Sequence, residues 1–413
     1  MKKILLYNMA STIGGAGISF LHYLNNIDRT QYEVVVYNNA NYPDIADIIE
    51  GMGIRTIRAN NSPVVFSHFS GSNGVSFSPI KVLNCFSIIR DCHRVSRSID
   101  EEKPDIIIVN SMTLFWIGRL AYKRGIRAIC LHREVYPEGT FGLRSRLIKY
   151  GLDRWFTDIA FISSHEETET AATHARTCVI FDKVDLDIYR NTEDRKTVRK
   201  RLGLPIDAFL VLYVGGIALL KGAHTMIDAM NYIDNSNIKL VFLQCPEPPK
   251  KKTLKDYMSP KAMLKLLLGL DYAAKVGSCY ANCNNKQCLI FKPGTTAIQE
   301  YFAACDVIAF PSYAPHQARP VYEAGAARIP VIISDFPQTA EFVTDGVTGF
   351  TFKPKDSKAL AKRIMWVYEN KDTDELRQVL KNNYSNTVRD HSTSTLREEI
   401  KSLLDEPDAA VNR

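Results

Sequence analysis

The residues best suited to chemistry in this chain lie directly after short apolar runs in its second half. The run Phe209–Val214 leads into Gly216 and then Lys221. A lysine between a strand-end loop and a helix is a suitable point charge for a diphosphate. Farther on, Pro320 stands near a predicted helix start and Glu323 lies one turn inside, which leaves backbone N–H groups for an anion and a carboxylate for ribose hydroxyls. A solvated lysine and a glutamate that only complements the helix dipole remain open alternatives.

The first half has a second group of such residues. Gly14, Gly15 and Gly17 form a turn after the first apolar run and before a helical stretch, where backbone N–H groups can approach a phosphate or a hydroxyl. The dinucleotide fingerprint requires a third glycine where Phe20 stands, which argues against NAD and FAD. His132 ends another apolar run beside two charged residues, so it either faces a cleft or has a structural role.

The elements that position these residues are short apolar runs without alternation, which is typical of parallel strands buried on both faces. The segments between the runs are long enough for crossover helices. We therefore predict strands at Ile4–Tyr7, Tyr32–Tyr37, Ile54–Ile57, Asp105–Val109, Arg127–Leu131, Ile159–Ile162 and Val179–Phe181, and after a polar linker at Phe209–Val214, Ile238–Leu243, Leu289–Phe291, Val307–Phe310, Val331–Ile333 and Phe350–Phe352.

Two such series predict an α/β protein with two doubly wound, Rossmann-like domains of parallel strands, whose strand-end loops face a common cleft. We expect an N-terminal acceptor domain at residues 1–188 and a C-terminal donor domain at 189–385. The tail at 386–413 is expected to form a helix that packs back on the first domain.

Composition narrows the classes of partner. The net charge is +7, and residues 250–292 contain nine lysines against two aspartates and no arginine. Nucleic-acid binders usually spread arginine and aromatic residues over a face, so this segment indicates either an anionic membrane surface or an ordinary helix with lysines in water. No apolar run reaches the roughly 18–20 residues of a membrane span. We expect a cytoplasmic protein, because its nine cysteines are scattered among apolar residues.

A metal site is not expected. Cys245, Cys279, Cys283 and Cys288 include no CxxC pair, and Asp185-Leu186-Asp187 has a metal-binding spacing but follows the linker-side strand.

The order of landmarks in the second half resembles one known family. Gly215-Gly216 and Lys221-Gly222 precede Phe310-Pro311-Ser312, which is followed by Glu323-Ala324 and Pro330-Val331-Ile332. This order is similar to that of the retaining glycosyltransferases of the GT-B fold in the large group 4. The likeness extends over nearly the whole chain and is strongest from 209 to 352.

The resemblance implies a role for each matching residue. Glu323 matches the second glutamate of the family's E-x7-E motif, which holds the ribose, and Lys221 matches the lysine on the donor diphosphate. The catalytic residues implied or proposed are His132, Lys221 and Arg319. The implied donor-binding residues are Gly15, Gly17, Gly216, Lys221, His316, Gln317, Arg319, Pro320, Val321 and Glu323.

Two positions depart from the family pattern. Pro315 stands where the first glutamate of the motif would be, so His316 or Gln317 is expected to contact the donor sugar instead. Gly216 replaces the usual arginine, and we hypothesise that Arg319 restores the lost charge.

The resemblance implies retaining, metal-independent transfer of a sugar from a nucleotide-diphosphate donor to a glycan or lipid-linked acceptor, without a cofactor. The departures leave two alternatives open, a GT-B-like protein that binds a membrane or a partner without transferring sugar, and a nucleotide-sugar epimerase.

Overall fold

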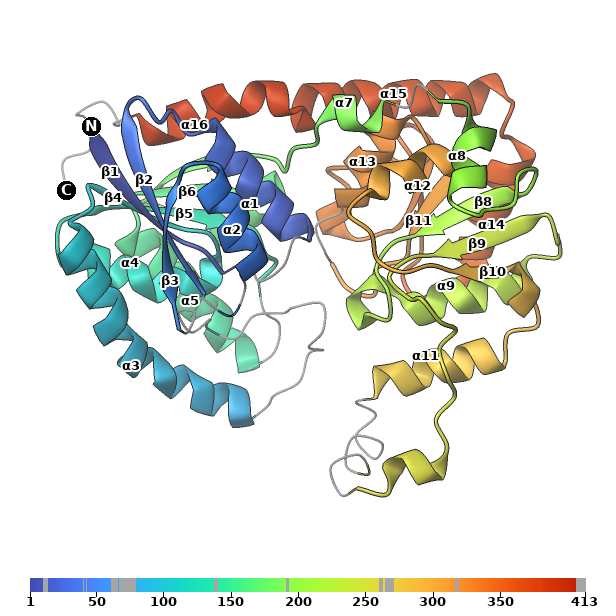
Figure 1. Cartoon of the computed structure of the whole chain (residues 1–413), viewed down its shortest axis with the longest axis horizontal. Helices are drawn as coiled ribbons and strands as arrows, with labels where there is room; N and C mark the ends of the chain where they lie inside the picture. Colours follow the sequence, from blue (N-terminus) through green and yellow to red (C-terminus); the bar gives the residue numbers. More distant parts are fainter. Residues whose placement is uncertain are drawn as a thin grey trace. The chain divides into compact units, whose positions relative to one another are not determined.

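The chain folds into two compact units (Figure 1). The computed structural model describes residues 1–9, 14–39, 41, 43–60, 66, 79–136, 140–190, 193–259, 263, 271–315 and 319–405. Unit 1 contains the described residues up to 183 together with those from 392, and unit 2 contains residues 184–391. The chain thus enters unit 2 five residues before the expected boundary at 188 and returns to unit 1 at Ser392, within the expected tail.

Unit 1 is built on a seven-stranded parallel sheet in the order β3-β2-β1-β4-β5-β6-β7. Neighbouring strands pair in parallel along the whole sheet, with Ile4 opposite Val34 on one side and opposite Ile106 on the other. The strands are β1 (Lys2–Tyr7), β2 (Tyr32–Asn39), β3 (Arg55–Ala59), β4 (Ile106–Val109), β5 (Arg127–His132), β6 (Asp158–Phe161) and β7 (Arg176–Val179).

Helices cover both faces of this sheet, as parallel strands require. One apolar core joins α1 (Gly15–Asn26), α2 (Pro43–Gly51) and α16 (Leu396–Leu404) to one face. A second core joins α3 (Pro79–Glu102), α4 (Phe115–Tyr122) and α5 (Leu143–Trp155) to the other face, and Figure 1 shows these three helices together on one side of the strands. The short helix α6 (Ser164–Thr170) precedes β7.

The C-terminal helix α16 is fixed to unit 1 by charged hydrogen bonds at its last carbonyl groups. Arg127 donates from Nη1 to the carbonyl of Leu404 at 2.6 Å, and Arg176 donates from Nη2 to that of Leu403 at 2.9 Å. Asp158 accepts from the Nε atoms of both arginines, at 3.0 and 2.6 Å. Cations at a helix C-terminus satisfy its free carbonyl groups and complement its dipole.

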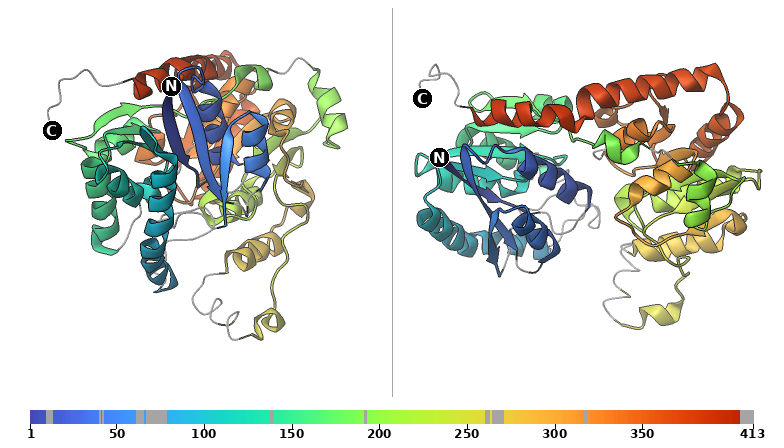
Figure 2. Two further views of the ribbon diagram at one scale, coloured as in Figure 1. Left: turned by 60° about the vertical axis from the view of Figure 1, so that its left-hand side comes forward. Right: turned by 45° about the horizontal axis from the view of Figure 1, so that its top comes forward.

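Unit 2 repeats the same strand order in a six-stranded parallel sheet, β10-β9-β8-β11-β12-β13. The strands are β8 (Phe209–Tyr213), β9 (Ile238–Phe242), β10 (Leu289–Phe291), β11 (Val307–Phe310), β12 (Val331–Ser334) and β13 (Phe350–Phe352). Figure 2 shows both units in two further orientations.

The faces of this second sheet are also covered by helices. The largest core packs α9 (Ala223–Ala229), α11 (Tyr272–Ala281), α14 (Ser357–Glu369) and α15 (Asp374–His391) onto one face. The helices α12 (Ile298–Ala304) and α13 (Arg319–Ala327) contact β8, β11 and β12, with α7 (Leu186–Tyr189) and α8 (Arg195–Arg201) packed on them. The doubly wound fold predicted from the apolar runs is confirmed in both units.

One predicted strand is misplaced. The expected strand Val179–Phe181 lies three residues upstream, at Arg176–Val179, because the pairing with β6 selects a segment whose arginine reaches Asp158. The lysine-rich segment 250–292, which the sequence left open as a membrane surface or an ordinary helix, lies partly outside the described residues, which include only Met263 of residues 260–270.

Two glycines allow α4 and α5 to approach closely. A Cβ atom on Gly151 would lie 2.3 Å from the ring of Phe115, and one on Gly118 would lie 2.3 Å from the ring of Phe156. Both distances are far shorter than van der Waals contact. The two helices can therefore pack this closely only because these two positions have no side chain.

We predict that Gly151→Ala lowers the free energy of unfolding by about 1–3 kcal/mol, because the added methyl group overpacks the interface. Urea denaturation of the full chain measures this change. The control is Gly51→Ala in α2, where no atom lies within 4 Å of the new Cβ; it should change stability by less than about 1 kcal/mol. Equal effects of the two substitutions would contradict the packing argument.

Candidate functional site

The loop after β8 can form its tight turns only with glycine. Gly216 and Gly222 have φ angles of 55° and 68°, in the left-handed region. A Cβ atom on Gly222 would lie 1.7 Å from the carbonyl oxygen of Pro311, so this loop packs directly on the loop that follows β11. The carboxyl ends of two neighbouring strands are thereby joined.

Gly216 also explains one departure noted in the sequence. A Cβ atom at this position would lie 2.9 Å from the carbonyl oxygen of Gln244, and the hydroxyl of Tyr213 donates to the Gly216 carbonyl at 3.0 Å. An arginine here would meet both the unfavourable φ angle and this backbone contact. The local geometry therefore selects glycine over the arginine of the family pattern.

Lys221 ends the short 3-10 helix Leu219–Lys221 and is half-buried. Its Nζ atom lies 4.7 Å from the centre of the Phe310 ring. Burial lowers the pKa of Lys221 to about 8, and the carboxylate of Glu323 partly opposes this by favouring the charged form. The structure thus brings Lys221 and Glu323, two of the predicted residues, into one electrostatic environment.

Glu323 lies in α13 with its side chain almost fully buried. Its Oε1 atom accepts a hydrogen bond from Nε of Arg319, one turn earlier, at 2.9 Å. The hydroxyl of Tyr189, on α7, also hydrogen-bonds to Glu323, and burial together with this carboxylate raises the pKa of Tyr189. The buried charge of Glu323 is therefore compensated by the Arg319 cation and the Tyr189 hydroxyl, in addition to its electrostatic interaction with Lys221.

Pro320 and Val321 form the buried first turn of the same helix. His316 and Gln317, the expected donor-sugar contacts, lie outside the described residues. Asp185 of the Asp-x-Asp sequence accepts from the backbone N–H of Asp187 at 3.0 Å and so caps α7. Within the part of the chain that the structure describes, no cluster of His, Cys, Asp and Glu has the geometry to hold a metal ion.

In unit 1, the glycine turn lies at the start of α1. Gly14 is the N-cap residue of this helix, and its carbonyl accepts from the N–H of Ile18 at 2.9 Å. Gly15 is exposed and Gly17 is buried, so the helix packs closely at Gly17 while its first residues are exposed. The preceding loop residues 10–13 lie outside the description.

His132 ends β5, as expected, but its side chain is enclosed. Its ring lies 5.0 Å from the rings of Tyr136 and Phe161, on the sheet face that packs against α4 and α5. Neither ring nitrogen has a hydrogen-bond partner among the residues that the structure describes, and burial lowers the pKa of His132 to about 3. The imidazole is therefore neutral at physiological pH, and its catalytic role stays a prediction.

Sequence reasoning missed two groups of residues. Asn8, Asn38 and Asn110 form a buried amide network at the carboxyl ends of β1, β2 and β4, with side-chain hydrogen bonds of 2.9 and 3.1 Å. The sequence does mark these positions, because each of the three asparagines directly follows an apolar run. Tyr189 had no such signal, since its contact with Glu323 joins segments more than a hundred residues apart.

A second missed group surrounds Tyr313, after β11. The Nζ atoms of Lys355 and Lys275 lie 4.1 and 5.9 Å from the centre of its ring, and the ring of His224 lies 5.5 Å away. The N–H of Tyr313 donates to the carbonyl of Leu220, so this cationic group borders the loop that contains Lys221.

With this geometry established, the chain can be compared with known proteins. Residues 194–387 match the sequence model of glycosyl transferases group 1. This segment contains Lys221, Arg319 and Glu323 and nearly all of unit 2.

Two curated relatives illustrate the likeness. A D-inositol 3-phosphate glycosyltransferase of Streptomyces scabiei is 28% identical over 192 residues, covering 45% of this chain and 40% of the relative. The putative teichuronic acid biosynthesis glycosyltransferase TuaC of Bacillus subtilis is 29% identical over 174 residues, covering 42% and 36%. The matched segment thus spans about two fifths of the length of these relatives.

Among solved structures, HepE of Anabaena, crystallised with UDP and glucose, has a TM-score of 0.71 at 18% identity, and the likeness covers 98% of this chain and 99% of HepE. A glycosyltransferase from Rickettsia africae has a TM-score of 0.72 at 15% identity, with 98% and 99% covered. The fold is therefore the GT-B fold predicted from the sequence. None of the described helices has the length and apolar character to cross a membrane.

We predict that Arg319→Ala lowers the free energy of unfolding by about 1–3 kcal/mol, because it removes the cation that donates a hydrogen bond to the buried Glu323 carboxylate. Urea denaturation measures the loss. The double variant Arg319→Met/Glu323→Gln should recover part of it, since no carboxylate is then buried without its arginine. Strict additivity of the single substitutions would contradict the coupling between these side chains.

Proposed function

We propose that this protein is a glycosyltransferase that moves a sugar, with retention, from a nucleotide-diphosphate donor to a glycan or lipid-linked acceptor. The observation that carries the proposal is that Lys221, in the loop after β8, and Glu323, in the helix that follows β11, interact electrostatically. This is the edge of an open α/β sheet at which ligands bind. The group 1 match over residues 194–387 supports the same assignment.

The two residues suit the two halves of a nucleoside diphosphate. The carboxylate of Glu323 has two oxygens with spare acceptor capacity after Arg319 has bound, and ribose hydroxyls are donors of the right kind. The ammonium of Lys221 is desolvated, so its interaction with a diphosphate is stronger than it would be in water. We propose that Arg319 holds Glu323 in position and adds positive charge at the N-terminal turn of α13.

In this proposal, catalysis rests on the leaving group. Departure of the nucleoside diphosphate leaves positive charge on the anomeric carbon and negative charge on the β-phosphate. Lys221 and the N–H groups at the start of α13 are fixed before the reaction and stabilise that negative charge without reorganising. The leaving phosphate accepts the proton of the acceptor hydroxyl on the same face of the sugar, which gives retention without a catalytic carboxylate pair or a metal ion.

The acceptor is assigned to unit 1, where the exposed start of α1 offers N–H groups to hydroxyls or phosphates. Contact between His132 and the transferred sugar requires a rearrangement of Tyr136 or its neighbours, because the ring is enclosed. Names of relatives such as the D-inositol 3-phosphate and teichuronic acid enzymes favour a polyol or polysaccharide acceptor.

A second function, binding of a nucleotide or partner without transfer, is favoured by one specific observation. Pro315 occupies the position of the family's donor-sugar glutamate, and Gly216 cannot be replaced by the family's arginine without strain.

We expect one nucleoside diphosphate or its sugar to raise the melting temperature of the full chain. Binding at about 100 times the dissociation constant adds about 2.7 kcal/mol of stability. UDP and UDP-glucose come first in the panel, because HepE was crystallised with UDP and glucose. Glu323→Gln should abolish most of the shift, and Lys358→Gln, on an exposed position of α14, should leave it unchanged.

The same panel separates the alternatives when product formation is measured. Transfer to an added acceptor supports the main proposal, and tight binding with neither transfer nor hydrolysis supports the binding protein. Conversion of a sugar nucleotide without acceptor indicates an epimerase. If no nucleotide in the panel raises the melting temperature, the proposed donor site is wrong.

Affinity for the nucleoside diphosphate should fall as the pH rises through about 8, because Lys221 has a pKa of about 8 and must be charged to bind. Titration calorimetry should show an affinity about tenfold weaker at pH 9 than at pH 7. Lys221→Arg stays charged and should show no such fall.

The contribution of Lys221 to the stability of the unliganded protein should instead increase as the pH rises. Between pH 8 and 10.5 the folded state has lost the Lys221 proton and the unfolded state still holds it, so this group raises stability with pH. A decrease in this window that Lys221→Met removes would contradict the assigned pKa.

A further inference from the structure

Helix α5 of unit 1 exposes an apolar stripe. Leu143, Leu147 and Tyr150 follow the i, i+4, i+7 spacing that places side chains on one helix face, and they are 61%, 44% and 60% exposed. Ile148 and Leu152, on the opposite face, are fully buried against the sheet. The helix is therefore apolar on both faces, although burial in unit 1 explains only one of them.

The polar positions on the exposed stripe are cationic. Arg146 and Arg154 lie three and eleven residues after Leu143, on the same face, and both are exposed. Neither forms an ion pair with an acidic side chain in the described ranges. The helix contains four basic residues against one acidic residue, Asp153. That carboxylate is already occupied by the N–H groups of Thr173 and His174, each at 2.7 Å.

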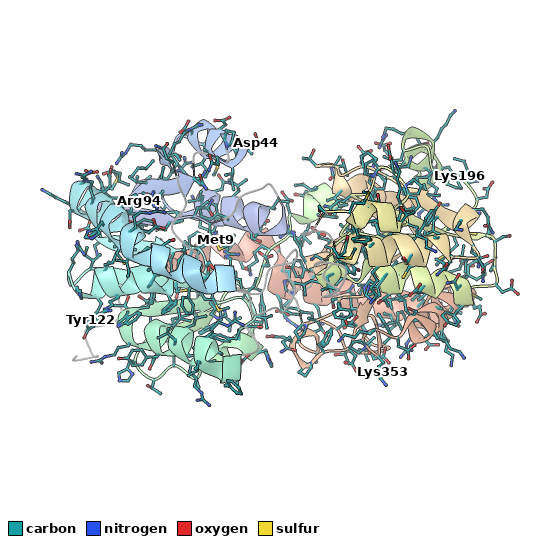
Figure 3. All side chains as sticks on the ribbon, turned by 90° about the horizontal axis from the view of Figure 1, so that it is seen from below. Met9, Asp44, Arg94, Tyr122, Lys196 and Lys353 are labelled. Atoms are coloured by element: carbon teal, nitrogen blue, oxygen red, sulfur yellow. The ribbon has the colours of Figure 1, made fainter. Side chains whose placement is uncertain are left out.

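Two further aromatic residues extend the stripe. Tyr122, at the end of α4, is 43% exposed, and the guanidinium carbon of Arg154 lies 6.0 Å from the centre of its ring. Figure 3 labels Tyr122 in a view from the side of α3, α4 and α5. Phe141, just before α5, is 97% exposed and has a left-handed φ of 52°. We call Tyr122, Phe141, Leu143, Arg146, Leu147, Tyr150 and Arg154 the α5 face.

We propose that the α5 face binds an anionic lipid surface. Helices that combine aliphatic and aromatic side chains with cations lie in the membrane interface, with the apolar groups among the acyl chains and the cations at the phosphates. The long stems of Arg146 and Arg154 allow their charged ends to reach phosphates while the stripe is inserted.

The sign of the charges favours a lipid surface over a protein partner. Both charged side chains of the α5 face, Arg146 and Arg154, are positive and lie beside exposed apolar side chains, and an anionic bilayer offers phosphates and acyl chains to both kinds of group. A uniformly anionic surface is the complement of such a face.

The α5 face is not the segment for which the sequence left a membrane contact open. The charge count pointed to residues 250–292 in unit 2, whereas the α5 face lies in unit 1 and has apolar side chains beside its cations. Lipid binding does not depend on the proposed glycosyl transfer, and neither Lys221 nor Glu323 takes part in it.

The test is co-sedimentation of the full chain with vesicles of phosphatidylcholine alone and of equimolar phosphatidylcholine and phosphatidylglycerol. Binding is expected only to the anionic vesicles. Leu147→Gln/Tyr150→Gln and Arg146→Gln/Arg154→Gln should each weaken it roughly tenfold, since they remove the apolar and the electrostatic contributions separately. Melting temperatures should stay unchanged, because all four side chains are exposed.

Matched controls come from other exposed helices. Ile48→Gln, on α2 at the other face of the sheet, and Lys358→Gln/Lys362→Gln, on α14, should bind vesicles as the natural chain does. In a Leu147→Trp variant, the tryptophan emission should shift to the blue on anionic vesicles.

Three results would overturn the inference. The first is vesicle binding that all the α5 variants retain. The second is binding that is lost only when Lys250, Lys251, Lys252 and Lys255 are replaced by glutamine. The third is a dimer, detected by sedimentation velocity, that the α5 variants dissociate while no chain binds vesicles.

Discussion

The parallel pairing of every strand is the constraint on which the rest of this structure depends. Parallel strands need a crossover between them and helices on both faces, so every strand ends at the same edge of its sheet. In unit 2 that edge receives the loop after β8 and the loop after β11, and α13 begins there. Glycines 216 and 222 have no side chains to separate these loops, so Lys221 and Glu323 share one environment although about a hundred residues lie between them.

Within this environment, burial and charge balance each other. Desolvation disfavours the charged form of Lys221 and lowers its pKa. Arg319 and Tyr189 stabilise the Glu323 carboxylate, and that carboxylate in turn favours the ammonium of Lys221. The result is a lysine whose pKa lies near physiological pH, at a sheet edge suited to anions. A bound diphosphate would complete this charge arrangement, which is why the donor site is the centre of the proposed function.

Unit 1 separates its roles by the two faces of its sheet. Alternation along β5 directs Leu131 to the core under α1 and His132 to the core under α4 and α5. The amide network of Asn8, Asn38 and Asn110 lies with the α1 face, where the exposed helix start offers N–H groups. The outer surface of α5, on the other face, exposes the stripe that we assign to a lipid surface. The conflict between the predicted role of His132 and its enclosure follows from this alternation.

The sequence by itself determined the architecture and pointed to half of the residues of the proposed donor site. Unalternating apolar runs could only be strands buried on both faces, and twelve of the thirteen predicted strands overlap the observed ones almost completely. Lys221 and Glu323 were recognisable because each lies in a strand-end or helix-start position that local spacing reveals. The i, i+4 spacing of Arg319 and Glu323 and the i, i+4, i+7 spacing of the α5 stripe are also present in the sequence. Tertiary structure alone decided that Tyr189 contacts Glu323, that Gly216 excludes an arginine and that His132 is enclosed. Each of these depends on packing between separate segments of the chain, which local residue patterns do not encode.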